Sequence, residues 1–123
     1  MNLEPFRTAL SERKAATEAD LENLARELRE LGGDNGDEGG SLGNHLADDG
    51  SNVQEQERII RVDGDLRAML VQIDDAFERM DAGTFGICAR CGEPIAAERL
   101  EYVPFVAYCI DCQAIVERQN GGG

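Results

Sequence analysis

Apolar residues recur along the first part of the chain with the spacing of a single helical face. From Pro5 to Leu31 the gaps alternate between three and four positions, which predicts an amphipathic helix that packs against a partner. Pro5 suits a first turn, where its missing N–H would have no intrahelical acceptor anyway. Lys14 is the charged interruption of this stripe, whose other members are Leu10, Thr17, Leu21, Leu24, Leu28 and Leu31.

A second stripe with the same spacing follows and predicts a second long helix. Ser51 and Gln54 fit a capping box at its start, because each side chain can bond a backbone N–H of the first turn. Gly83 suits the position just beyond its end. The stripe consists of Ile59, Val62, Leu66, Met69, Ile73, Ala76 and Met80.

The second helix contains both supporting and weakening residues. Three pairs place an acid four residues before a base, an order that stabilises helices: Glu57–Arg61, Asp63–Arg67 and Asp75–Arg79. Gly64 lies inside the helix and weakens it by roughly 1 kcal/mol relative to alanine.

The segment between the stripes has a different composition. From Gly32 to Gly50 it contains seven glycines and five acids, and no Lys or Arg occurs from Gly32 to Glu57. Such a segment buries too little apolar surface to offset the entropy cost of ordering it, so we expect a flexible connection over about residues 32–50. Two similar helices joined in this way predict an antiparallel coiled-coil hairpin over residues 1–82.

Charge and hydropathy restrict the partners. The 123 residues include 25 Asp plus Glu and 12 Lys plus Arg, a formal net charge of −13. Nucleic-acid binding draws much of its affinity from Lys and Arg displacing counterions, so direct DNA binding is not expected. The sequence has no apolar run of about 18 residues and no secretory signal pattern, so we expect no membrane association and a cytoplasmic location.

All four cysteines lie in two CxxC pairs, Cys88 with Cys91 and Cys109 with Cys112, separated by 17 residues. This spacing is typical of four-thiolate zinc sites, and in a reducing compartment such pairs more often bind metal than form disulfides. A redox dithiol, an iron–sulfur cluster and disulfides are the alternatives. Gly92 lets the first turn close without a side-chain clash.

We predict one structural Zn²⁺ at these cysteines. Four thiolates leave no position for a reactive water, so no enzymatic activity is expected. Arg90 and Arg99 are expected to offset the negative charge of the site. The predicted fold is therefore mostly α: a hairpin, then a four-cysteine zinc finger over residues 83–123 that ends in a short helix at "QAIVERQ".

The stretch "GTFGICARCGEPIAAERLEYVPFVAYCIDCQ" resembles the DksA/TraR family of bacterial RNA polymerase-binding regulators. The shared features are Phe-Gly before the first pair, both CxxC pairs, the Gly-Glu-x-Ile turn and the Cys-Ile-Asp-Cys exit. The resemblance implies a transcription regulator whose coiled coil enters the secondary channel of RNA polymerase while the zinc-bearing part rests on the outside. Some members act together with guanosine tetraphosphate, which the resemblance adds as a partner at the polymerase interface.

The resemblance also implies a partner-binding tip at Asp48, Asp49 and Gly50. The family pattern is an Asp, any residue and an Ala, shortly before an acidic helix start. Here Asp48 stands at the Asp position and Gly50 stands where Ala is usual. The residues alone offer a simpler interpretation, since acids before a helix N-terminus are stabilised by the helix dipole.

Two other functions are weighed against the regulator. One is a zinc-ribbon adaptor that binds a different protein through the hairpin, which would need the Leu21–Leu31 stripe. The other is a DNA-binding zinc finger, which the net charge of −13 disfavours.

Overall fold

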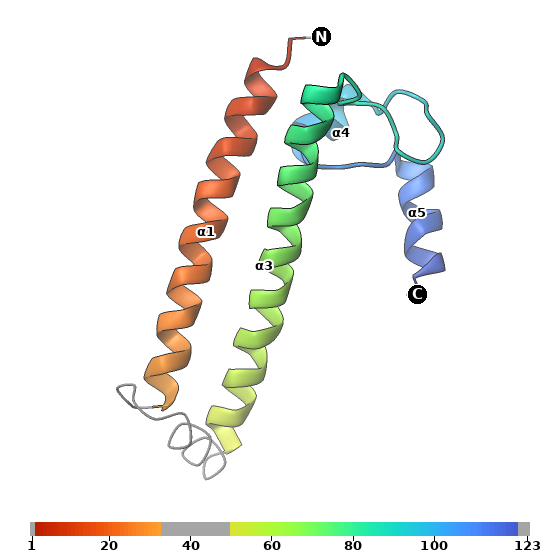
Figure 1. Ribbon diagram of the computed structural model, residues 1–123. Helices are drawn as coiled ribbons and strands as arrows, with labels where there is room; N and C mark the ends of the chain where they lie inside the picture. Colours follow the sequence, from red (N-terminus) through yellow and green to blue (C-terminus); the bar gives the residue numbers. More distant parts are fainter. Residues whose placement is uncertain (1, 33–49, 121–123) are drawn as a thin grey trace. The chain divides into compact units, whose positions relative to one another are not determined.

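The computed structural model describes residues 2–32 and 50–120, and these are mostly helical (Figure 1). The helices are α1 (Glu4–Gly32), α3 (Gly50–Ala82), α4 (Ala97–Tyr102) and α5 (Ile110–Gln119). Within the described ranges, β structure is limited to an isolated bridge between Ile87 and Pro94. The predicted fold class is confirmed: a long helical hairpin precedes a cysteine-rich part and a short C-terminal helix.

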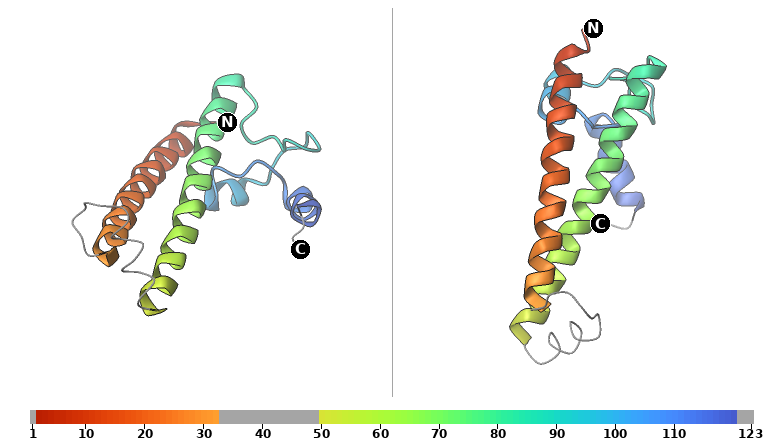
Figure 2. Two further views of the ribbon diagram at one scale, coloured as in Figure 1. Left: turned by 60° about the horizontal axis from the view of Figure 1, so that its bottom comes forward. Right: turned by 60° about the vertical axis from the view of Figure 1, so that its left-hand side comes forward.

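The chain forms two compact units. The first unit joins Met1–Lys14 with Val71–Gly123, and the second unit is Ala15–Leu70. α1 and α3 each contribute a part to both. Within each unit these two parts lie side by side and run in opposite directions, as the three ribbon views agree (Figures 1 and 2). The proposed domains, residues 1–82 and 83–123, remain a prediction.

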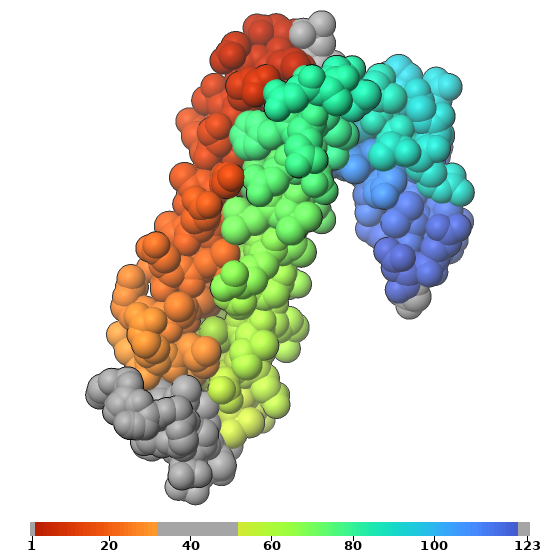
Figure 3. Space-filling model, in the orientation of Figure 1, coloured from red at the N-terminus to blue at the C-terminus, as the bar shows by residue number. Residues whose placement is uncertain are grey.

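The second unit is built on the two predicted stripes. Thr17, Leu24 and Ile59 are buried, at 2%, 8% and 2% exposure. The parts of α1 and α3 in this unit are in contact in the space-filling view (Figure 3). Thr17 is the polar member of its stripe, and its hydroxyl donates to the Met69 sulfur at 3.7 Å across the helix pair. The remaining stripe residues of this unit are half-buried: Leu21, Leu28, Leu31, Val62, Leu66 and Met69.

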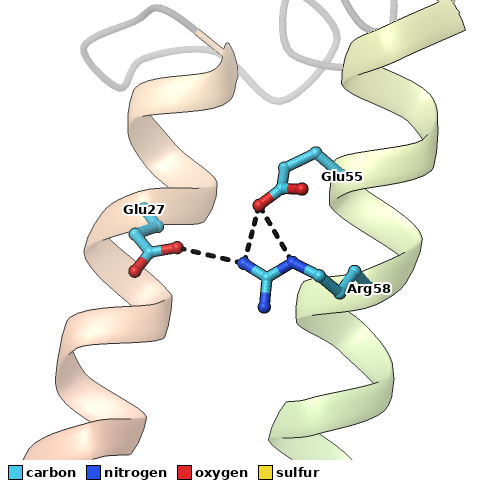
Figure 4. Close-up of polar contacts among 3 residues, drawn as sticks. All are labelled: Glu27, Glu55 and Arg58. Carbon is cyan, nitrogen blue, oxygen red and sulfur yellow. Dashed lines mark hydrogen bonds and ion pairs between the residues drawn. The ribbon is translucent and has the colours of Figure 1, made fainter.

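Charged side chains bridge the same pair of helices nearer to Gly32 and Gly50. Arg58 Nη2 and Nε donate to Glu55 Oε2 at 2.6 and 3.0 Å, and Nη2 also lies 3.5 Å from Glu27 Oε1 on α1 (Figure 4). The three side chains are 44–50% exposed. Exposed pairs of this kind each contribute about 0–1 kcal/mol, so the apolar stripes provide most of the packing energy here.

In the first unit, the hairpin stripe is interrupted by charge. Leu10 and Ile73 are fully buried, whereas Lys14 reaches out to Asp74, with Nζ 2.9 Å from Oδ1. The pair lets a lysine occupy a stripe position because its ammonium group ends at the surface beside an acid. Close to the chain start, the Phe6 ring lies 5.3 Å from the ring of Phe85, just after α3.

Gly83 ends α3, as predicted. Its φ of +80° is in the left-handed region. The Thr84 N–H donates to the Arg79 carbonyl at 2.8 Å and the Gly83 N–H donates to the Met80 carbonyl at 3.2 Å. These two bonds form a Schellman motif, which satisfies carbonyls at the helix end and turns the chain sharply into the cysteine segment.

Candidate metal centre

The first cysteine pair lies on a tight backbone turn. The Cys88 N–H donates to the Glu93 carbonyl at 2.8 Å, and the Gly92 N–H donates to the Cys88 carbonyl at 3.0 Å. Gly92 has φ +80°, which side-chain-bearing residues rarely adopt. The N–H groups of Arg90 and Cys91 both point at the Cys88 sulfur, at 3.4 and 3.5 Å. The predicted role of Gly92 in closing this turn agrees with the backbone.

The second pair is positioned by the start of α5. Cys109 is the N-cap residue, and its sulfur accepts a hydrogen bond from the Cys112 N–H at 3.5 Å. One backbone bond ties this segment to the first turn, from the Ala89 N–H to the Ala107 carbonyl at 2.8 Å. The two cysteine pairs, which are distant in sequence, therefore lie close together in the structure.

The four sulfur atoms all lie within 4.8 Å of one another. The Cys91 and Cys109 sulfurs are 3.9 Å apart. Tetrahedral zinc with Zn–S bonds of about 2.3 Å needs sulfurs about 3.8 Å apart, so the donor set fits. Cys88 and Cys112 are 2% and 4% exposed, whereas Cys91 is exposed. The site is thus closed on one side and reaches the surface on the other.

The electrostatics of the sulfurs favour a bound cation. Burial raises the pKa of the Cys88 thiol, but N–H groups of Cys91, Cys109 and Arg90 outweigh burial and lower this pKa to about 6. At Cys112, burial and the neighbouring thiols raise the pKa to about 12 despite a hydrogen bond from Arg90. Like charges this close disfavour full ionisation, and a divalent cation would offset that repulsion.

The two arginines expected near the site have different roles. Arg90 Nη1 lies 3.8 Å from the Cys112 sulfur, so its charge does face the thiols. Arg99 on α4 instead donates from Nε to the Tyr108 carbonyl at 3.1 Å and holds the chain just before the second pair.

Arg79 is a structural residue that the sequence did not reveal. Its Nη2 donates to the carbonyls of Val106 and Phe105 at 3.2 and 3.5 Å, which links α3 to the loop before the second cysteine pair. Burial lowers the pKa of this guanidinium although Asp75 and Tyr108 raise it. The helical spacing predicted only its local pairing with Asp75, because the loop contacts are distant in sequence.

Comparison with known proteins relates this geometry to a family. Residues 83–118 match the prokaryotic dksA/traR C4-type zinc finger. General stress protein 16O of Bacillus subtilis is 34% identical over 98 residues, which cover 80% of this chain and 56% of that protein. The RNA polymerase-binding transcription factor DksA of Caulobacter vibrioides is 32% identical over 75 residues, which cover 61% of this chain and 53% of that protein. The chain thus spans about half the length of these curated relatives.

A solved structure extends the match to the hairpin. Transcription factor DksA2 from Pseudomonas aeruginosa superimposes with a TM-score of 0.72 at 30% identity, covering 94% of this chain and 82% of that chain. The chain belongs to the DksA/TraR family. The matches cover both the C4-type zinc finger and the helical hairpin in front of it. The resemblance that the cysteine segment indicated is therefore confirmed.

The structure describes only one of the three predicted tip residues. Asp48 and Asp49 lie outside the described residues, and Gly50 is the first residue of α3. Their partner-binding role therefore remains a prediction. In the part of the chain that the structure describes, no helix has the length and apolar character needed to cross a membrane.

Proposed function

We propose that this protein binds bacterial RNA polymerase and regulates transcription initiation. The observation that carries the proposal is the match to DksA2 over 94% of this chain, because it includes the hairpin as well as the finger. The relative from Caulobacter vibrioides is named as an RNA polymerase-binding transcription factor, which supports the same partner here.

In this proposal the finger holds one Zn²⁺ with a structural role. Its ligands are the four thiolates of Cys88, Cys91, Cys109 and Cys112, whose sulfurs already lie within 4.8 Å of one another. The metal would fix the two cysteine turns to each other. The Arg79 bond to the Val106 carbonyl would hold that finger to α3, and the Arg99 bond to the Tyr108 carbonyl would hold α4 to the chain before the second cysteine pair.

The hairpin would act through its acidic end. We propose that the end bearing Asp48, Asp49 and Gly50 enters the secondary channel, with Asp48 nearest the polymerase active site. The excess of acids over bases, 25 against 12, supports a basic partner surface, since complementary charge speeds encounter and fixes orientation.

The family resemblance adds guanosine tetraphosphate as a partner at the polymerase interface, and one cavity of the first unit has too little positive charge to bind it alone. That cavity, of about 660 Å³, is lined by Asp75 and Glu117 and by a single cation, Arg99. That guanidinium already donates to the Tyr108 carbonyl. We therefore propose that guanosine tetraphosphate binds at the interface with polymerase, where the partner supplies the positive charge.

In vitro transcription with purified polymerase tests the function directly. We expect wild-type protein to bind core polymerase and to change initiation. The double variant Asp48→Asn/Asp49→Asn should still bind, because it alters only the tip charge, and it should lose most of the effect on initiation. The matched control is Asp34→Asn/Asp37→Asn, which removes two charges from the same acidic segment and should behave as wild type.

Three results of that experiment would contradict parts of the proposal. Absence of binding to polymerase at low salt would refute the partner. Equal effects of the two double variants would refute a specific role for Asp48 and Asp49. An effect on initiation that added guanosine tetraphosphate does not change would refute its role as a partner. The adaptor alternative is less favoured, because Leu24 is buried and Leu21, Leu28 and Leu31 are half-buried, which leaves little of this stripe for another partner.

A further inference from the structure

Residues 105–108 form an irregular segment that stands directly before Cys109. A segment that is neither helix nor strand has backbone carbonyls that need donors from elsewhere. All four carbonyls of this segment accept a hydrogen bond from another element of the first unit: Phe105 and Val106 from Arg79 Nη2 at 3.5 and 3.2 Å, Ala107 from the Ala89 N–H at 2.8 Å, and Tyr108 from Arg99 Nε at 3.1 Å. The segment is therefore held by α3, by the first cysteine turn and by α4 at once.

Arg79 is the donor of this set that comes from the hairpin. Ala89 and Arg99 belong to the cysteine-rich part itself, whereas Arg79 lies in the last turn of α3. Burial lowers the pKa of its guanidinium, which exchanges part of its hydration for the two carbonyls. From α1, the Arg13 guanidinium lies 5.9 Å from the centre of the Phe105 ring. Both hairpin helices thus contact the chain just before the second cysteine pair.

The segment leads into a residue that helps to position two of the four sulfurs. Cys109 is the N-cap of α5, and its sulfur accepts the Cys112 N–H at 3.5 Å, so a displacement of Cys109 also moves Cys112. The Cys91 sulfur lies 3.9 Å from that of Cys109, a separation that suits tetrahedral thiolate coordination. The position of residues 105–108 therefore decides whether the two cysteine pairs reach one metal ion.

We propose that Arg79 is a positioning residue of the metal site, which holds residues 105–108 so that Cys109 and Cys112 reach the first cysteine pair. The inference rests on the zinc site proposed above and adds a residue that is not itself a ligand. Groups outside the ligand set that orient the ligands commonly change metal affinity by about 10–100-fold. Arg79 acts through the backbone before the ligand, so the lower end of that range applies.

The same bonds should transmit metal binding to the hairpin. Coupling between two sites is reciprocal, so a contact that strengthens zinc binding is itself strengthened when zinc is bound. The Arg79 carbonyl accepts the Thr84 N–H in the motif that ends α3. Bound zinc should therefore protect the Gly83 and Thr84 amide hydrogens from exchange, and its loss should loosen the end of α3.

The experiment measures the zinc affinity of the full chain by competition with a chromophoric chelator. Arg79→Met should bind zinc about tenfold more weakly than wild type, because both carbonyls lose their donor. Arg79→Lys keeps a charged donor for one carbonyl, so it should recover part of the affinity. The matched control is Arg67→Met on the same helix, because the Arg67 guanidinium instead pairs with Asp63 at 2.8 Å. Its zinc affinity should equal that of wild type.

Unfolding with and without zinc separates positioning from general stabilisation. If Arg79 only stabilised the fold, Arg79→Met would lower the free energy of unfolding equally in both conditions and leave zinc affinity unchanged. Under the proposal, metal-free Arg79→Met keeps the helicity and stability of metal-free wild type, and the loss arises only when zinc is present. Amide exchange of the wild-type chain with and without zinc gives a test that needs no variant.

The outcomes distinguish the positioning role from the zinc site itself. Unchanged zinc affinity in Arg79→Met, an equal loss in Arg67→Met, or exchange at Gly83 and Thr84 that zinc does not slow would each overturn the positioning role while the zinc site stands. Failure of the wild-type chain to bind zinc would instead overturn the proposed site, and this inference with it.

Discussion

At the scale of single residues, two glycines, one inside α3 and one just after it, differ in backbone conformation. Gly64 lies inside α3 in an ordinary conformation, whereas Gly83 has φ +80°, and an added Cβ would meet no atom within 4 Å at either site. Gly64→Ala should therefore stabilise the protein by about 1 kcal/mol through helix propensity. Gly83→Ala should destabilise it by about 1–2 kcal/mol, because alanine disfavours the left-handed region.

Urea unfolding of the zinc-loaded protein, followed by circular dichroism, measures both effects. The substitution is identical, so the two variants serve as controls for each other. A loss of stability in Gly64→Ala would mean that the α3 backbone needs glycine there for a reason beyond helix propensity.

Residue roles that depend on local backbone could be predicted, and those that depend on distant contacts could not. The positions of Gly83 and Gly92 after a helix and after a CxxC pair were sufficient to assign their turns. Arg79 was predicted from its spacing to pair with Asp75, but its guanidinium donates to carbonyls 26 and 27 residues away. The spacing of residues along a helix does not predict which distant loop a side chain of that helix contacts.

At the scale of elements, the Lys14–Asp74 pair connects α1 and α3 in the first unit through an exposed ion pair. The two side chains are 38% and 54% exposed, so their ion pair contributes at most about 1 kcal/mol. Lys14→Leu would complete the apolar stripe, and we expect a gain of about 1 kcal/mol in the free energy of unfolding. Asp74→Asn, which keeps the lysine, should instead cost less than about 1 kcal/mol.

Salt provides the control for this element-scale prediction. Raising the ionic strength screens exposed pairs, so it should reduce the difference between wild type and Asp74→Asn. A loss of stability well above 1 kcal/mol in Lys14→Leu would show that the pair contributes more than exposed pairs usually do.

The long helices could be predicted because their stripes repeat many times. Every stripe residue of both helices is buried or half-buried, including the interrupting Lys14. α4 was not predicted, because six residues contain too little of a helical repeat to stand out. The tertiary contact between Phe6 and Phe85 also lay beyond the sequence, since it joins segments without a shared local pattern.

At the scale of the whole chain, stability has two different origins. In the second unit, Ala15–Leu70, the described residues are helical and are held by apolar packing, and the sequence of this unit contains no cysteine. The four-cysteine segment of the first unit has short helices of 6 and 10 residues and few large buried side chains. A segment this small generally needs a metal or disulfides to stay folded, so the proposed zinc should matter for the finger far more than for the second unit.

Metal removal tests this division. With a strong chelator under reducing conditions, we expect α4 and α5 to unfold while most far-ultraviolet ellipticity remains, because α1 and α3 contain 29 and 33 residues. Added Zn²⁺ should restore the lost signal. The matched control is Cys109→Ser, which removes one ligand and should weaken zinc binding without changing the helicity of the chelated protein. If the metal-free chain kept the full wild-type signal and the same finger contacts, the four cysteines would not be held together by zinc. Complete loss of helix would instead show that the hairpin depends on the finger for its own stability.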